Sequence, residues 1–244
     1  MAIETLFLLT AGVFVIALLY SSVGHAGASG YIAVMSLLSL APAEIKPIAL
    51  ALNILVASIG SWQFWRAGHF SWSLFWPFAI LAVPFAFLGG YLNLPTQVFK
   101  VVVGIVLLIS AAQFLARPPA ESETHPPARS LAVGVGAGLG LLSGLTGTGG
   151  GIFLTPLLIF LRWTRTRTAS AISALFILLN SIAGLLGNIS ATRSFPKFGA
   201  SLLVAAAIGG LIGSHLGSRR LAPTAIKRLL AIVLVIAGTK LIFT

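Results

Sequence analysis

Long apolar runs separated by short charged turns fill almost the whole chain, and they constrain its fold more than any other feature. The sequence is 58% hydrophobic and only 8% charged, whereas soluble domains usually carry about 25% charged residues. Crossing a membrane takes a helix of about 20 apolar residues. We therefore predict an all-α, polytopic membrane protein with about eight to ten crossings and no soluble catalytic domain. The apolar runs cover residues 5–23, 30–41, 47–65, 72–92, 97–116, 131–145, 151–161, 169–189, 199–216 and 226–243.

One polar stretch divides the chain into two parts. Residues 117–129 hold four of the 12 prolines and two of the 4 acidic residues, which is typical of an exposed linker. We expect a first transmembrane repeat over 1–116 and a second over 130–244. The run at 5–23 is expected to stay in the mature protein, because Glu4 stands where a signal peptide carries basic residues.

Sequence landmarks recur in the same order in both parts. Asn53 precedes Gly60 by seven positions, as Asn180 precedes Gly187. This agreement favours a duplication of about five apolar segments. An odd number of crossings in each repeat makes the two repeats inverted relative to each other, which is the arrangement we favour. Glycines spaced by three also recur, at Gly24, Gly27, Gly30, Gly144, Gly147 and Gly150.

These glycine clusters are predicted to break helices. A glycine inside a helix costs about 1 kcal/mol relative to alanine. Beyond each cluster only a short apolar piece remains, 30–41 or 151–161, too short to span the bilayer upright. Broken helices in corresponding positions of two repeats indicate the binding site of a transporter, because irregular backbone at membrane depth must line protein or a cavity. Close helix packing through small residues is the alternative.

The residues around these clusters resemble the sulfite exporter TauE/SafE family, also called the toluene sulfonate uptake permeases. The resemblance covers nearly the whole chain, although His25 and Ser29 depart from the commoner glycine-rich form of the family. It implies transport of small sulfur-containing anions such as sulfite, thiosulfate, sulfoacetate or other organosulfonates, with a substrate that varies among members. The segments that carry it are 143–151, 176–187, 22–31 and 52–57.

The charge distribution favours an anion independently. The 4 acidic residues lie at segment ends or in the linker, so no carboxylate is expected inside the membrane to bind a cation. The N-terminus of a broken helix offers backbone N–H groups and about half a positive charge. We expect the anion to bind at the midplane between the two breaks, with no metal, cofactor or catalytic residue. The candidate substrate-binding residues are Ser22, Gly24, His25, Gly27, Ser29, Gly30, Asn53, Ser143, Thr146, Gly147, Thr148, Gly149, Gly150 and Asn180.

Two kinds of side chain in this set have a second interpretation. His25, when protonated, could pair with the anion and couple transport to a proton, but a structural histidine on a backbone carbonyl is weighted almost equally. Asn53 and Asn180 lie in the middle of apolar runs, where they either line the site or join helices.

The basic residues predict the orientation. The net charge of +11 is spread over turns and forms no continuous face, so we expect the lipid bilayer of a bacterial inner membrane as partner and no nucleic acid. An inverted arrangement places ten of the 15 Lys and Arg on one side, against nine for a parallel one, and leaves both chain ends outside the cytoplasm. The five assigned to the other side are Lys46, Lys100, Arg193, Lys197 and Lys240.

Two other functions compete with transport. Residues 27–30 match the Gly-x-Ser-Gly form of rhomboid intramembrane proteases, with Ser29 as nucleophile and His215 as the base. A non-transporting membrane scaffold is the other, but a scaffold has no use for paired broken helices. We expect a transporter, with export favoured, rather than an enzyme. A proton is considered as the coupling ion, and a homodimer as one option for the oligomeric state.

Overall fold

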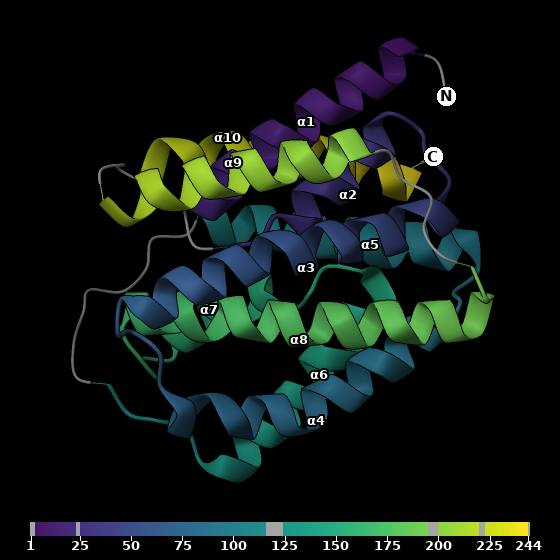
Figure 1. The fold of residues 1–244 in the computed structure, drawn as a ribbon. Helices are drawn as coiled ribbons and strands as arrows, with labels where there is room; N and C mark the ends of the chain where they lie inside the picture. The colour runs from purple at the N-terminus through teal and green to yellow at the C-terminus, as the bar shows by residue number, and fades with distance from the viewer. Residues whose placement is uncertain (1–2, 23–24, 116–123, 195–199, 220–222, 244) are drawn as a thin grey trace.

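The computed structural model describes residues 3–22, 25–115, 124–194, 200–219 and 223–243. Over these ranges the regular structure consists of ten helices without a strand, which confirms the all-α prediction (Figure 1). The helices are α1 (Ile3–Ser22), α2 (Ala28–Leu37), α3 (Pro42–Arg66), α4 (Trp72–Tyr91), α5 (Thr96–Leu115), α6 (Arg129–Thr146), α7 (Gly151–Phe160), α8 (Thr166–Thr192), α9 (Ala200–Arg219) and α10 (Pro223–Phe243).

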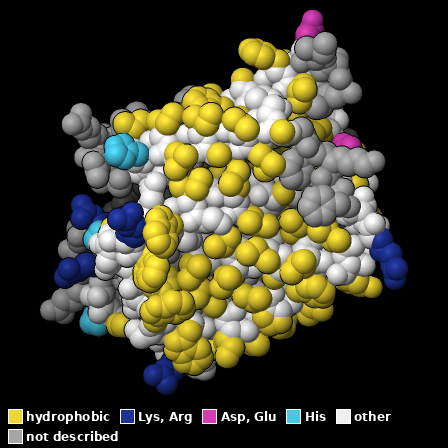
Figure 2. All heavy atoms as spheres, viewed as in Figure 1, with side chains coloured by type: hydrophobic (Ala, Val, Ile, Leu, Met, Phe, Trp, Pro, Cys, Tyr) yellow, Lys and Arg dark blue, Asp and Glu magenta, His cyan; other side chains and the backbone are white. Residues whose placement is uncertain are grey.

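Several helices are long and apolar enough to cross a membrane. Among the described residues there are 6 such candidates, located in α1, α3, α4, α5, α6 and α8, while α2 and α7 are shorter apolar helices. Figure 2 shows hydrophobic side chains over the middle of the molecule and a group of Lys, Arg and His side chains along its left edge. Together these features confirm the prediction of a polytopic membrane protein.

Both predicted helix breaks are present. Gly27 precedes α2 with a φ of 104°, and Gly147, Gly149 and Gly150 between α6 and α7 have φ of 80°, 77° and 78°. Only glycine adopts this left-handed backbone without steric cost. Each following helix, α2 or α7, has 10 residues, or about 15 Å, which is about half of the hydrocarbon core.

Each short helix folds back along the helix before it. The first turn of α2 packs against Ile16 of α1, and Val34 near the end of α2 packs against Gly12. In the second half, the backbone N–H of His125, before α6, donates to the carbonyl oxygen of Arg162, after α7, at 2.9 Å. The pairs α1–α2 and α6–α7 are therefore hairpins that return toward the end at which they began.

Helices α3 and α8 lie side by side and run in opposite directions (Figure 1). Because α3 follows the first hairpin and α8 follows the second, this direction makes the two hairpins enter from opposite ends of the protein. The residue pairs that meet along the crossing are Leu50 with Gly184, Asn53 with Ser181, and Gly60 with Ala174.

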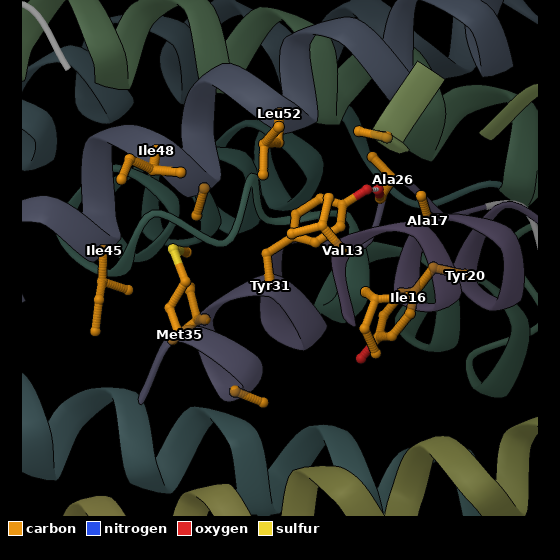
Figure 3. Packing of buried hydrophobic residues seen from close by; sticks show 14 of the residues in the cluster. Val13, Ile16, Ala17, Tyr20, Ala26, Tyr31, Met35, Ile45, Ile48 and Leu52 are labelled. Atoms are coloured by element: carbon orange, nitrogen blue, oxygen red, sulfur yellow. Dashed lines mark hydrogen bonds between the residues drawn. The ribbon is translucent and has the colours of Figure 1, made fainter. Parts of the chain in front are cut away.

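The buried hydrophobic residues form two clusters, and neither is confined to one half of the sequence. The larger lies mainly on α1, α2, α3, α5, α9 and α10, and Figure 3 shows part of it around Tyr31. The smaller lies on α4, α6, α7 and α8. Helix α1 packs on α9, and α4 packs on α6 and α8. We call these two packing units the large unit and the small unit; they meet along the α3–α8 crossing.

Small residues also mediate close helix packing, the alternative role considered for the glycines. Within the small unit, glycines of α6 lie against backbone carbonyl oxygens of α4 with no side chain between them. Glycine therefore serves both purposes here, forming the breaks and bringing helices together. The contacting pairs are Gly136 with Phe78, Gly140 with Ala82, and Gly144 with Ala86.

Candidate binding site at the helix breaks

Three polar side chains line the second break and are buried. Ser143, Thr146 and Thr148 are 0%, 0% and 4% exposed. The Thr146 hydroxyl donates to the carbonyl oxygen of Leu142 at 2.6 Å, and the hydroxyl oxygens of Thr146 and Thr148 are 2.9 Å apart. Because a hydroxyl has a single proton to donate, Thr148 is the donor in the second bond. The second break is thus lined by neutral hydroxyl groups.

Asn53 connects α3 to this break. Its side chain is 0% exposed, and Nδ2 donates to the carbonyl oxygen of Thr148 at 3.4 Å and to Oγ of Ser181 at 3.3 Å. The Cα of Gly149 lies so close that a Cβ there would be 2.5 Å from Asn53 Nδ2. The structure therefore brings together Asn53, Thr148 and Gly149, three of the predicted site residues, and adds Ser181, which the sequence analysis missed.

Asn180, next to Ser181 on α8, is a buried polar group with unsatisfied hydrogen-bonding atoms. It is 0% exposed, and neither its Nδ2 nor its Oδ1 has a hydrogen-bond partner among the described residues. The same holds for Oδ1 of Asn53 and Oγ of Ser143. A buried polar atom without a partner costs about 1–3 kcal/mol, so such a group needs an explanation, for which a bound molecule is a candidate.

The first break has a different set of contacts. Ser29 is 2% exposed, and its Oγ lies 2.8 Å from the hydroxyl oxygen of Tyr20. The Tyr31 hydroxyl donates to the carbonyl oxygen of Ala26 at 2.9 Å, and Figure 3 shows it directed at that residue. The backbone N–H of His25 donates to the carbonyl oxygen of Tyr20 at 3.0 Å. Tyrosine side chains of α1 and α2 therefore brace this break.

A small pocket opens beside the first break. His25, which is half-buried, lines it together with polar residues of α1 and α9, Ser21 and Ser214. Oγ of Ser21 is buried without a hydrogen-bond partner among the described residues, while Ser214 donates to the carbonyl oxygen of Gly210 at 2.6 Å. The remaining lining residues are Ala26, Val56, Ala57, Gly60, Phe64 and Ala174.

The other predicted site residues have structural contacts or cannot be placed. Ser22 donates to the carbonyl oxygen of Leu19 within α1, at 2.6 Å. Gly30 lies against Ile16 and Tyr20, where a Cβ has no room. Gly24 lies outside the described residues. The presence of serine at position 22 and of glycine at position 30 is thus explained by helix structure and by packing within the hairpin.

Charged side chains near the breaks differ from the expectation at one position. The acids described, Glu4 and Glu44, are exposed as expected, whereas Glu121 and Glu123 lie outside the described residues. Lys46, assigned above to a turn, lies inside α3 and is only 5% exposed. The error arose because the apolar run begins after Lys46 although the helix begins four residues before it.

The ammonium group of Lys46 is fully hydrogen-bonded. Nζ donates to the carbonyl oxygens of Gly89, Gly90 and Leu92 at 3.1, 2.9 and 3.1 Å, where α4 ends. These three acceptors match the three protons of an ammonium group. A Cβ at Gly147 would lie 3.1 Å from the Lys46 carbonyl oxygen. The backbone of Lys46 therefore borders the second break, while its buried ammonium group lies at the end of α4.

The residues named for the protease alternative lie in different environments. Ser29 is buried and hydrogen-bonded with Tyr20, whereas His215 is exposed on α9. A serine nucleophile needs its general base within about 2.6–3.2 Å. The hydrogen bond of Ser29 with Tyr20 therefore gives no support to His215 as its base.

A helical protein with two re-entrant broken hairpins and a polar crossing between them has the architecture of secondary transporters. Comparison with known proteins agrees with this class. The family model for the sulfite exporter TauE/SafE matches residues 8–241. The chain belongs to this family, which confirms the resemblance seen in its motifs.

Two relatives carry the same general description. One from Sinorhizobium fredii (strain NBRC 101917 / NGR234), named probable membrane transporter protein y4hK, is 43% identical over 235 residues, covering 94% of this chain and 95% of the relative. Another from Bacillus subtilis (strain 168), named probable membrane transporter protein YjnA, is 27% identical over 249 residues, covering 95% and 97%. No solved structure matches the chain. The protein is a multi-pass membrane transporter.

Proposed function

We propose that this protein moves small sulfur-containing anions, such as sulfite, thiosulfate, sulfoacetate or other organosulfonates, across the inner membrane of a bacterial cell by alternating access, with export as the favoured direction. The family description supports this substrate class. The anion binds where the two hairpins approach the α3–α8 crossing. The protein needs no metal or cofactor for this, and its chemistry is binding rather than bond cleavage.

The observation that carries the proposal is the set of buried polar atoms without partners on α3, α6 and α8. Asn180 has two, and Asn53 and Ser143 have one each, among the described residues. Of these atoms, Asn180 Nδ2 and the Ser143 hydroxyl can donate hydrogen bonds to the oxygens of a sulfonate or sulfite, whereas the two asparagine Oδ1 atoms are acceptors and do not bond to the anion. Neutral donors bind an anion without forming a fixed ion pair, which lets the transporter release it.

The arrangement of the helices supports an inverted repeat, which the mechanism requires. Helices α3 and α8 are antiparallel at their crossing, and the two hairpins enter from opposite ends. If the second five helices repeat the first five, the α1–α9 pair corresponds to the α6–α4 pair, and both pairs are present. Inverted repeats of this kind expose a midplane site to each side in turn.

The pocket beside the first break supports a state of the transporter in which the two breaks differ in accessibility. It reaches His25 and Ser21, while Ser143, Thr146 and Thr148 at the second break are buried. The pocket lies toward the end of α3, whose last residue is Arg66. We assign this basic end to the cytoplasm by the positive-inside rule, and we give His25 the role of carrying a proton with the anion.

Binding can be tested by thermal stability of the purified protein with sulfite, thiosulfate, sulfoacetate, taurine and sulfate. An anion that binds the folded form raises the unfolding temperature. We expect stabilisation by at least one sulfur oxyanion and its transport into proteoliposomes. Asn180→Leu should weaken both effects about tenfold while the protein still folds. If no anion of this panel stabilises the protein or is transported, the proposed function is wrong.

A further inference from the structure

Lys46 is the buried charge that the proposed binding site leaves unused. It lies in α3, in the large unit, while its three acceptors lie at the end of α4, in the small unit. The two described acids are exposed, and Glu44 lies on another face of the same helix from Lys46. The charge is thus stabilised by carbonyl dipoles at a helix C-terminus rather than by a carboxylate.

This bond spans the joint between the two packing units. Asn53 makes another such link, from α3 to Thr148 and Ser181. If the units separate at the second break, Lys46 loses the carbonyl oxygens of α4. An ammonium group left buried without acceptors carries a large free-energy penalty. Opening at this end therefore needs a new acceptor for the three protons.

We propose that the transported anion is this acceptor. Lys46 is a gate residue. While the two packing units are closed at the second break, its ammonium group donates to the carbonyl oxygens of α4. When the units open there, it donates to the oxygens of the anion beside Gly147. The empty transporter is then held closed at this end, and an anion at the second break permits opening. This inference rests on the proposed function and adds to it a residue that selects for negative charge.

Lys240 provides a matched control. Its Nζ also donates to helix-end acceptors, namely the carbonyl oxygens of Ser36 and Leu37 at 3.2 and 3.0 Å and Oγ of Ser39 at 3.2 Å. It lies in α10 and binds the end of α2, so both partners belong to the large unit. The two lysines make similar bonds, but only the Lys46 bond crosses the joint.

The first experiment compares anion affinity, measured by calorimetry with sulfoacetate and sulfate on the full chain. Lys46→Met should raise the Kd at least about tenfold, because a hydrogen bond to a charged group is lost. Lys46→Arg should keep most of the affinity, and Lys240→Met should leave it unchanged. A purely structural role for Lys46 would lower the unfolding temperature of Lys46→Met without changing its Kd.

The second experiment measures opening directly. The chain has no cysteine, so Leu50→Cys introduces a single thiol, at a 0% exposed position that contacts Gly184 at the joint. Its alkylation by a maleimide should accelerate several-fold when sulfoacetate, which does not react with maleimides, is added. Adding Lys46→Met should make the labelling fast with or without the anion, whereas Lys240→Met should not.

The outcomes separate the two proposals. If the unmodified protein binds an anion and Lys46→Met binds it equally well, the gate role is wrong and the transport function stands. The gate role is also wrong if the labelling rate of Leu50→Cys, with Lys46 intact, is the same with and without the anion. If the unmodified protein binds none of the sulfur anions, the proposed function fails, and the role of Lys46 fails with it.

Discussion

The two helix breaks occupy corresponding places in the sequence but differ in their surroundings. Among the described residues, the first has one left-handed glycine, Gly27; it is hydrogen-bonded by two tyrosines and borders a small pocket. The second has three left-handed glycines, is buried, accepts a hydrogen bond from Asn53 and contacts the backbone of Lys46 from α3. Two breaks that recur in sequence are therefore held in different states.

Under the proposed mechanism, this difference indicates which contacts change during transport. At the first break the polar bonds of Ser29 and Tyr31 stay within the first hairpin. Asn53 bonds to Thr148 at the second break and Lys46 bonds to the end of α4, both across the joint between the packing units. Only the second set has to break when the units move, so variants at the second break should have the larger effects.

The largest effect is expected at Gly149. In Gly149→Ala the new Cβ would lie 2.5 Å from Asn53 Nδ2 and 3.0 Å from Ser181 Oγ, at a φ of 77°. We expect anion uptake into proteoliposomes to fall about 100-fold, because a misplacement of about 1 Å in a binding constellation costs that much.

Gly68→Ala is the control for backbone strain in this experiment. Gly68 has a φ of 73°, but its Cβ would meet nothing within 4 Å. It carries the same cost of about 1–2 kcal/mol for a left-handed residue without touching the joint, so uptake should be nearly normal. Equal losses in the two variants would mean that Asn53 and Ser181 have no special role.

The next effect is expected at the two asparagines. Asn180→Leu removes two buried polar atoms that have no partner among the described residues, so the unfolding temperature should stay the same or rise. The Kd for the anion should rise about tenfold, by loss of a hydrogen bond to a charged group. Asn53→Leu should lower both the affinity and the unfolding temperature, because its bonds to Thr148 and Ser181 are lost. Unchanged anion affinity in Asn180→Leu would remove it from the site.

A moderate effect is expected at His25, next to the pocket of the first break. If a proton moves with the anion, uptake should change several-fold across pH 5 to 8, the range in which histidine commonly changes its charge. His25→Gln should flatten this profile while leaving the anion affinity within about threefold of normal, since glutamine can still donate one hydrogen bond. An unchanged pH profile in this variant would exclude His25 as the proton carrier.

The smallest effect is expected at Ser29. Ser29→Ala removes the hydroxyl bonded to Tyr20, which should shift the anion affinity by less than about tenfold, the loss of a single neutral hydrogen bond. Tyr20→Phe should behave alike, because it removes the other half of the same bond. The protease would be favoured instead if the unmodified protein cleaved a membrane peptide and Ser29→Ala did not, while Ser29→Ala kept full transport.

The sequence predicted the elements better than their contacts. Glycine spacing and apolar length located both breaks, because these depend on local backbone preference. The partners Ser181 and Tyr20 were missed because helix register across a crossing has no local sequence signal. The helical position of Lys46 does have a local sequence signal, because Pro42 and Glu44 mark a helix start before it. It was missed because a charged residue before an apolar run was interpreted as part of a turn. The substrate-binding roles of the candidate residues stay predictions.

The packing units have one more consequence. Each unit contains helices from both sides of the linker. The large unit combines α1, α2 and α3 with α9 and α10, and the small unit combines α4 with α6, α7 and α8. In the proposed mechanism, the bodies that move against each other are therefore not the N-terminal and C-terminal pieces of the polypeptide. Each piece contributes to both bodies, so a chain severed between α5 and α6 would leave neither piece with a complete rigid body of its own.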